Sequence, residues 1–184
     1  MNTKLSDVIV NRRTIHNFAS DRCPDQSTIQ SALEIARWAP NHYLTEPWHV
    51  YFIGPETKES ICQLNADIVR TKNGEQAAEK KLTRWRCNPG WMLLTCDKSD
   101  DALRQQEDYA SCCCFIQNLS LVLWEKEVGM KWSTGDVIRD SGMYELCNID
   151  ETTEIIVGIL WYGYANAVPT MKRKSLAEFT KYLV

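Results

Sequence analysis

Hydrophobic and polar positions along the chain predict a succession of helices and strands. Several stretches carry apolar side chains at helical spacing. They are residues 4–12, 26–38, 56–69, 100–128 and 136–147. Pro40 ends the second of these helices, because the residue before a proline is disfavoured in the helical region. Residues 176–183 predict one further turn or two of helix, and the polar, basic stretch 70–88 predicts a helix or a mobile loop.

Four shorter apolar runs predict strands. They are residues 48–54, 90–97, 130–133 and 153–165. The longest helical pattern, 100–128, is apolar nearly all round between Ala110 and Trp124, which predicts a central, buried helix. Helices combined with about four strands predict an α+β or α/β fold. The length of 184 residues fits one domain, residues 1–184.

Composition narrows the class of protein. The chain is 44% hydrophobic and 24% charged, as expected for a globular protein. No apolar run approaches the ~20 residues that span a bilayer, and the first residues lack the apolar stretch of a signal peptide. These features predict a cytoplasmic protein with no membrane partner.

The net charge of −3 is unevenly distributed. Residues 1–22 carry +2 and residues 155–184 carry +3, whereas residues 97–154 carry −8. A nucleic-acid-binding protein normally shows a broad basic surplus, and this chain does not, so we expect no nucleic-acid partner. Two short basic ends are better suited to a small anion.

Eight cysteines could suggest a metal site or a disulfide framework. They form no C-x-x-C pair and have no nearby histidine at zinc spacing. The consecutive Cys112, Cys113 and Cys114 would point about 100° apart on a helix, so they cannot converge on one ion. We therefore predict no metal and interpret the cysteines as buried free thiols, with one reactive thiol near an active site as the alternative.

Basic clusters stand near both ends of the chain. Arg12, Arg13 and Thr14 follow the first predicted helix, and Lys172, Arg173 and Lys174 follow Pro169. Paired guanidiniums and a hydroxyl can bind phosphate oxygens. Either cluster alone is more typical of a solvated basic surface. Their pairing across the chain is what points to one dianion held between the two ends.

Two further segments are candidates for ligand contacts. Residues 39–48 form a loop stiffened by Pro40 and Pro47, which displays amides, an imidazole and aromatic rings. Residues 129–135 could lay backbone amides and an aromatic edge along a flat heterocycle. Plain turn chemistry is the alternative interpretation of both segments.

Taken together and in order, these segments resemble the FMN-dependent nitroreductase family, over essentially the whole chain. The family's opening pattern Arg-Arg-Ser-x-Arg-x-Phe stands here as residues 12–18, and its flavin loop ending in Gln-Pro-Trp stands as residues 40–48. Asn41-His42 and the short length resemble a compact bacterial subfamily. Gln117-Asn118-Leu119, Gly129, Trp132, Gly158, Gly163 and residues 172–176 follow the central helix and the closing segments.

The resemblance implies a fold and an assembly. Members have a nitroreductase-like α+β fold, with a central antiparallel or mixed sheet of four to five strands surrounded by helices. Two subunits intertwine into a homodimer, and FMN lies at the interface. NAD(P)H reduces the flavin and leaves, and a nitroaromatic, quinone or related acceptor then takes the electrons in a ping-pong reaction. The flavin N5 carries the chemistry, so no catalytic side chain is expected.

The resemblance also implies roles for particular residues. The phosphate would be held by Arg12, Arg13, Thr14 and Arg173, with His16 and Lys172 in the same two motifs. Trp38 and His42 would lie near the flavin. Trp132, Ser133 and Thr134 would run along the isoalloxazine.

Two departures from the family pattern favour a rival function. His16 replaces a permanent cation by a group with an unperturbed pKa of about 6.5, and Glu46 stands where glutamine is common. Either change could weaken flavin binding. The alternative is therefore a protein that stores FMN or senses redox state without efficient NAD(P)H turnover. A cysteine-rich metal or redox protein is a third possibility. Segment 70–88 could be a lid that steers an anionic nicotinamide, or a solvated helix face.

Overall fold

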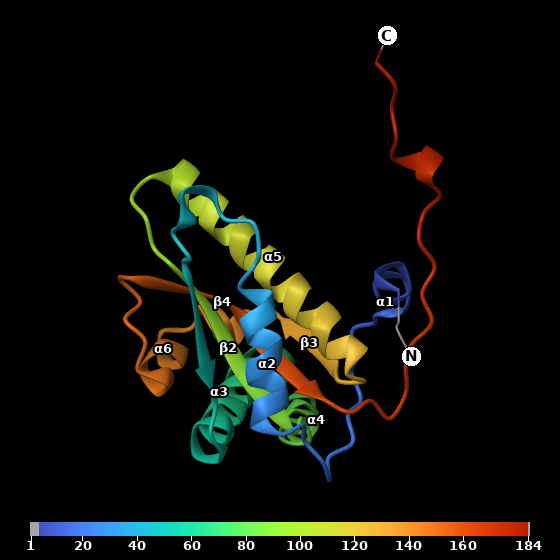
Figure 1. The fold of residues 1–184 in the computed structure, drawn as a ribbon. Coiled ribbons are helices and arrows are strands. Elements are labelled where there is room, and N and C mark those ends of the chain that lie inside the picture. The colour runs from blue at the N-terminus through green and yellow to red at the C-terminus, as the bar shows by residue number, and fades with distance from the viewer. Residues whose placement is uncertain (1–3, 184) are drawn as a thin grey trace.

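The structure, a computed structural model, describes residues 4–183 and has an α+β fold (Figure 1). Within that range four strands form one sheet: β1 (Trp48–Phe52), β2 (Gly90–Asp97), β3 (Gly129–Ser133) and β4 (Glu154–Gly163). Their order is β1-β2-β4-β3, and every neighbouring pair is antiparallel. The sheet is therefore antiparallel rather than mixed, and it has the lower of the two expected strand numbers.

Six α-helices surround this sheet in the described part of the chain. They are α1 (Leu5–Asn11), α2 (Gln26–Ala36), α3 (Pro55–Asn73), α4 (Glu75–Arg86), α5 (Ala102–Glu125) and α6 (Ser141–Cys147). Short 3-10 turns cover His42–Leu44, Asp136–Arg139 and Leu176–Glu178. The basic stretch 70–88 is thus helix over most of its length, and the helix predicted over 136–147 is interrupted at Asp140, which caps α6.

Successive side chains of the central strand β2 pack into two separate hydrophobic cores, one on each face of the sheet. Met92 and Leu94 of β2 pack against α2 and α5 on one face, and Trp91 and Leu93 pack toward α3, α4 and α6 on the other. This period of two follows from the strand pleat. The second core contains three mutually packed indoles, Trp85, Trp91 and Trp161, with ring centroids 4.9–5.7 Å apart.

Helix α5 runs diagonally across one face of the sheet, as its apolar sequence predicts (Figure 1). Asp101 caps its N-terminus by accepting hydrogen bonds from the amides of Leu103 and Arg104. Its buried side includes Phe115 and Leu119, whereas Gln117 on another side is exposed. The helix therefore covers the sheet with one face and leaves a polar position free for contacts elsewhere.

The C-terminal segment contains the least helix that the sequence predicted, and that turn is 3-10 rather than α. Residues 176–183 form only one 3-10 turn, and the tail runs away from the sheet and its helices (Figure 1). A capping box at Ser175 and Glu178 starts that turn, but Leu176 and Phe179 are each 68% exposed. A short helix needs an apolar face to pack, and the tail finds none on its own chain.

The cysteines are all free thiols, but they are not all buried. Cys62, Cys96 and Cys112 are buried, as expected, whereas Cys23 and Cys87 are exposed. Burial raises the pKa of Cys62 to about 11, which keeps that thiol protonated at neutral pH. The expectation of uniformly buried thiols is therefore wrong at the two exposed positions.

Candidate functional site

Three arginines from the two ends of the chain line one pocket. Arg12 and Arg13 follow α1, and Arg173 belongs to the C-terminal tail. The hollow between them has a volume of about 440 Å³ and is completed by Ile9, Val10, Gln117 and Met171. No carboxylate is among these lining residues. We call this hollow the arginine pocket.

Charge and burial in the arginine pocket favour an anionic occupant. Burial, followed by the charges of Arg13 and Arg173, lowers the pKa of Arg12, yet an arginine stays protonated in proteins. Arg13 donates hydrogen bonds from Nη1 to the carbonyl oxygens of Val10 at 2.6 Å and Arg12 at 2.9 Å, so part of its fork is engaged by the end of α1. Arg12 and Arg173 are therefore the freer anion-binding groups.

The segment after Arg13 lies against the edge strand of the sheet. Thr14 forms a parallel bridge with Met130, and the Ile15 amide donates to the Met130 carbonyl at 3.2 Å. Ile15 is fully buried beside Gly129, where a Cβ would come within 2.5 Å of the Ile15 Cγ1. Glycine at this position thus permits the close approach. The Thr14 side of the segment is exposed, next to the arginines.

A second pocket opens on the α3–α4 side of the sheet, with a volume of about 260 Å³. Two buried side chains in its lining have hydrogen-bond donors without partners: the Asn65 Nδ2 and the Trp161 Nε1. A buried donor left unpaired costs about 1–3 kcal/mol, so an acceptor that reached either nitrogen would be stabilising. We call this hollow the donor pocket.

The remainder of the donor pocket is mostly cationic. Its lining includes Lys72, Lys81, Arg84, Lys131, Ser133, Gly135 and Asp136. Asp136 is paired with Lys72, whose Nζ lies 2.8 Å from its carboxylate. Desolvation, with Arg84 and Lys81 as further causes, lowers the pKa of Lys131 to about 8. A ligand rich in acceptor atoms would therefore fit this pocket.

His16 lies close enough to the donor pocket for two of its cations to act on it. Desolvation, then the charges of Lys131 and Arg84, lower the pKa of His16 below its usual 6.5. His16 is therefore mainly neutral at pH 7, and it lies within reach of the charges of the donor pocket. It stands four positions after Arg12, a backbone span of at most about 14 Å.

The predicted β3 residues divide between the two faces of the sheet. Ser133 lines the donor pocket. Trp132 instead packs with the α2–α5 core, and its Nε1 donates to the Val157 carbonyl at 3.1 Å. The Thr134 carbonyl accepts a hydrogen bond from Arg139 at 3.2 Å. Trp132 and Thr134 line neither pocket, and Lys172 is exposed beside Arg173 without lining one.

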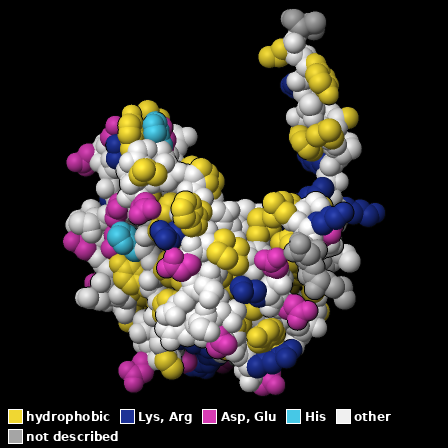
Figure 2. Space-filling view, viewed as in Figure 1, with side chains coloured by type: hydrophobic (Ala, Val, Ile, Leu, Met, Phe, Trp, Pro, Cys, Tyr) yellow, Lys and Arg dark blue, Asp and Glu magenta, His cyan; other side chains and the backbone are white. Residues whose placement is uncertain are grey.

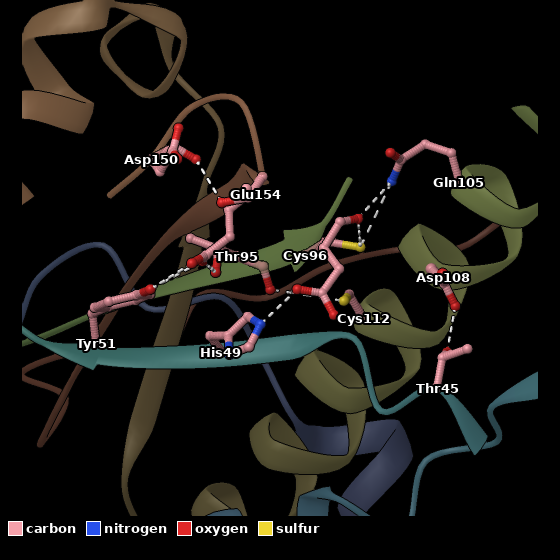
Figure 3. Close-up of polar contacts among 12 residues, drawn as sticks. Thr45, His49, Tyr51, Thr95, Cys96, Gln105, Asp108, Cys112, Asp150 and Glu154 are labelled. Carbon is pink, nitrogen blue, oxygen red and sulfur yellow. Dashed lines mark hydrogen bonds and ion pairs between the residues drawn. The ribbon is translucent and has the colours of Figure 1, made fainter. Parts of the chain in front are cut away.

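The loop after α2 is fixed to the N-terminal half of α5. Thr45 donates to Asp108 at 2.6 Å (Figure 3), and Asn41 donates to Ser111 at 3.2 Å. His42 Nδ1 lies 3.1 Å from Glu107, and its ring stacks on Tyr43 with centroids 4.0 Å apart. Three residues here have positive φ: Tyr43, Leu44 and Glu46. Such backbone is costly and is found more often at functional sites.

Within one chain, Trp38 and His42 do not meet the arginine pocket. His42 contacts α5 at Glu107, and the arginine pocket includes Gln117 on the same helix. Ten helical residues separate those positions, or roughly 15 Å. Trp38 is 80% exposed, and neither residue lines the two pockets.

Sequence reasoning pointed to the basic and β3 parts of the donor pocket but missed Asn65 and Trp161. Lys81 and Arg84 belong to the basic stretch 70–88, where an i, i+3 spacing already places them on one helix face. Asn65 and Trp161 gave no signal, because both sit in apolar patterns that predict core positions. Their unpartnered donors become visible only when the burial of each atom is known.

In the described residues, no helix is long and apolar enough to cross a membrane, and no group of three histidine, cysteine or carboxylate side chains could hold a metal ion.

Comparison with known proteins identifies the family of this chain. The family model for the nitroreductase family matches residues 9–164, so the chain belongs to that family. YfhC of Bacillus subtilis (strain 168), provisionally named an NAD(P)H nitroreductase, is 29% identical over 175 residues, which cover 93% of this chain and 89% of YfhC.

Solved structures share the fold over their whole length. A nitroreductase-like family protein from Bacillus cereus is 28% identical, with a TM-score of 0.85 and coverage of 100% of this chain and 97% of that chain. The FMN- and NADPH-dependent nitroreductase NfnB from Sphigopyxis sp. strain HMH is 16% identical, with a TM-score of 0.79 and coverage of 99% and 100%. At 16% identity, the similarity to NfnB shows a shared fold only.

Proposed function

We propose that this protein is an FMN-dependent oxidoreductase that uses NAD(P)H to reduce nitroaromatic, quinone or related acceptors. The observation that carries the proposal is the pairing of two pockets of complementary chemistry. Arginines from both chain ends line the first, and unpartnered buried donors line the second. Structural relatives whose names specify FMN and NADPH support the choice of cofactor.

The arginine pocket would hold the FMN phosphate. Arg12 and Arg173 would donate charge-assisted hydrogen bonds to the phosphate oxygens, and such bonds are about twice as strong as neutral ones. Arg13 would add its free donors. The Thr14 hydroxyl and Lys172, each adjacent to one of these arginines, would complete the phosphate contacts. Gathering like charges costs free energy without a ligand, and a dianion would offset that cost.

The donor pocket would hold the pyrimidine edge of the flavin ring. That edge presents carbonyl oxygens, and Asn65 Nδ2 and Trp161 Nε1 are donors without acceptors. Ser133 and the neighbouring Thr134 lie at the end of β3, where the ring would pass. The segment from Arg12 to His16 would run alongside the ribityl chain, since Arg12 lines the arginine pocket and the charges of Lys131 and Arg84 in the donor pocket act on His16.

Bound FMN would supply the redox chemistry, accepting a hydride equivalent from NAD(P)H at N5 and passing electrons to the acceptor. The chain would bind and orient the ring and would contribute no covalent catalyst. Donor and acceptor would occupy the same cleft in turn, which is a ping-pong reaction.

The proposed active form is a homodimer with FMN at the interface. Large apolar side chains are exposed on α1 and on the tail, including Leu5, Val10, Phe179 and Tyr182. Figure 2 shows such side chains along the tail, which rises beside an open hollow. A partner chain would cover them. Trp38 and His42, which reach neither pocket of their own chain, would then lie near the flavin of the partner.

One observation favours the rival function, an FMN-storing or redox-sensing protein. His16 is mainly neutral at pH 7, so it would add little to anion binding. Purified protein titrated with FMN and then mixed anaerobically with NADPH or NADH separates the two functions. Rapid bleaching of bound flavin is the expected result for the oxidoreductase. Bound flavin that stays oxidised supports the rival, and failure to bind FMN would overturn both.

A further inference from the structure

Lys131 occupies a distinctive place in the donor pocket. It lies on β3 directly opposite Trp161 of β4, and its Nζ stands 4.8 Å from the centre of the Trp161 ring. The same indole carries one of the two unpartnered buried donors. Lys131 is half-buried, and the ion pairs of residues 4–183 give it no carboxylate partner.

Charged groups from every surrounding element face Lys131. They are His16 from the segment after α1, Lys72 from α3, Lys81 and Arg84 from α4, and Asp136 from the 3-10 turn after β3. Asp136 is engaged by Lys72 at 2.8 Å. His16 is mainly neutral at pH 7. The cation that lies over the Trp161 indole is therefore Lys131, and His16 adds little positive charge there.

We propose that Lys131 sets the reduction potential of the bound flavin, by placing a positive charge beside the donors that receive the pyrimidine edge of the ring. This inference rests on the proposed function. Two-electron reduction adds two electrons and one proton to the ring and leaves a negative charge at that edge near neutral pH. A cation there binds reduced FMN more tightly than oxidised FMN, which raises the potential.

The same geometry couples reduction to proton uptake. In the cofactor-free pocket, desolvation by burial, with the charges of Arg84 and Lys81 as lesser causes, sets the pKa of Lys131 at about 8. A negative ring raises that pKa. Above pH 8, reduction therefore draws one additional proton onto the Lys131 Nζ, and the potential falls more steeply with pH. At any pH where Lys131 is protonated in both states, it adds no slope.

The test measures the midpoint potential of FMN-loaded protein between pH 6.5 and about 9.5, by equilibration with reference dyes. Lys131→Met should lose at least tenfold in the preference for reduced over oxidised FMN, which lowers a two-electron potential by about 30 mV. It should also lose the steeper slope above pH 8. Lys131→Arg should keep the potential at pH 7 but lose the steeper slope, because arginine does not titrate there.

Lys80→Met is the matched control. Lys80 precedes Lys81 on α4 but is exposed and lines neither pocket, so its loss should leave the potential unchanged. Equal potentials and slopes for wild type and Lys131→Met, or an equal fall in Lys80→Met, would overturn the inference while leaving FMN binding intact. If Lys131→Met fails to fold, the slope of Lys131→Arg decides. A wild-type protein that binds no FMN would overturn the proposed function as well.

Discussion

Arg12 and Arg173 stand near opposite ends of the sequence, and their side chains line the same pocket. That Arg12 and Arg173 meet at one pocket depends on two separate features of the fold. The segment after α1 is bound to the edge strand, and the tail returns past Asn166, whose amide donates to the Asn17 carbonyl at 3.0 Å. Neither cluster would hold an anion well alone. Their convergence forms a site with enough positive charge for a phosphate.

Removing one guanidinium should therefore weaken FMN binding. Arg12→Ala or Arg173→Ala deletes a charge-assisted hydrogen bond worth about 1.5–3 kcal/mol, so we expect a dissociation constant raised roughly ten- to hundredfold. Flavin fluorescence quenching during titration gives the constant. Arg86→Ala is the control, because Arg86 is exposed, pairs with Glu59 and lines neither pocket. Equal affinities for Arg12→Ala and Arg86→Ala would remove Arg12 from the site.

The approach of Ile15 to Gly129 should be sensitive to a single methyl group. In Gly129→Ala the new Cβ would lie 2.5 Å from the Ile15 Cγ1, and Ile15 is fully buried. Overpacking of this kind costs about 1–3 kcal/mol in unfolding free energy. Urea denaturation measures the loss. Gly54→Ala is the matched control, since no atom lies within 4 Å of its Cβ position and its φ is negative. Equal stabilities of the two variants would contradict the prediction.

Removing an unpartnered donor should weaken FMN binding without lowering the stability of the cofactor-free protein. Asn65→Leu replaces a buried amide, whose Nδ2 has no partner, by an apolar side chain of similar size. Cofactor-free protein should be as stable as wild type or slightly more stable, because the desolvation cost disappears. FMN affinity should fall roughly three- to tenfold. Denaturation and FMN titration of the same preparation test both parts, and a variant that loses stability but keeps its affinity would show that Asn65 is structural.

The sequence predicted the core elements and the convergence of the two basic ends better than it predicted the donor pocket. Strand β2 occupies residues 90–97, as its apolar run indicates, because a strand buried on both faces leaves a continuous signal. Arg12, Arg13 and Arg173 meet in one pocket as the resemblance implied. The donor pocket depends instead on which atoms of Asn65 and Trp161 lack partners, and that is a property of the packing, which no local pattern encodes.

Trp132 illustrates a second limit of prediction from the sequence. Its strand was predicted correctly, but β3 alternates its side chains between the two faces of the sheet. Lys131 faces the donor pocket and Trp132 faces the core. A resemblance at the level of a motif identifies a segment, whereas the pleat decides which of its side chains face the donor pocket.

The tail should be the part of the chain most dependent on a partner. Phe179 is 68% exposed, and Phe179→Glu would place a charge where we propose a dimer contact. We expect this variant to dissociate at protein concentrations where wild type remains a dimer, and to bind FMN more weakly because Arg173 lies on the same tail. Sedimentation velocity across a concentration series measures the dissociation. Leu146→Glu on α6 is the control, since α6 lies on the other side of the fold (Figure 1). A wild-type monomer would contradict the prediction.

Lys131 should reduce the stability of the cofactor-free protein at neutral pH. Its pKa is lowered to about 8 in the folded chain and returns toward 10.5 on unfolding, chiefly because burial penalises the charged form. Between those two values the unfolded state binds more protons, so stability contributed through this group rises with pH. Below pH 8, Lys131 is charged in both the folded and the unfolded state. The full cost of burying that charge then lowers the free energy of unfolding. Lys131→Met should therefore be more stable than wild type at pH 7.

The stability difference between Lys131→Met and wild type should shrink as pH rises from 8 to 10.5, because wild-type Lys131 then becomes neutral in the folded state. Paired urea titrations at pH 7, 8.5 and 10 measure it, and other titrating groups, such as Tyr162, affect both proteins alike. A difference that is constant across this pH range would show that Lys131 keeps its ordinary pKa in the folded protein.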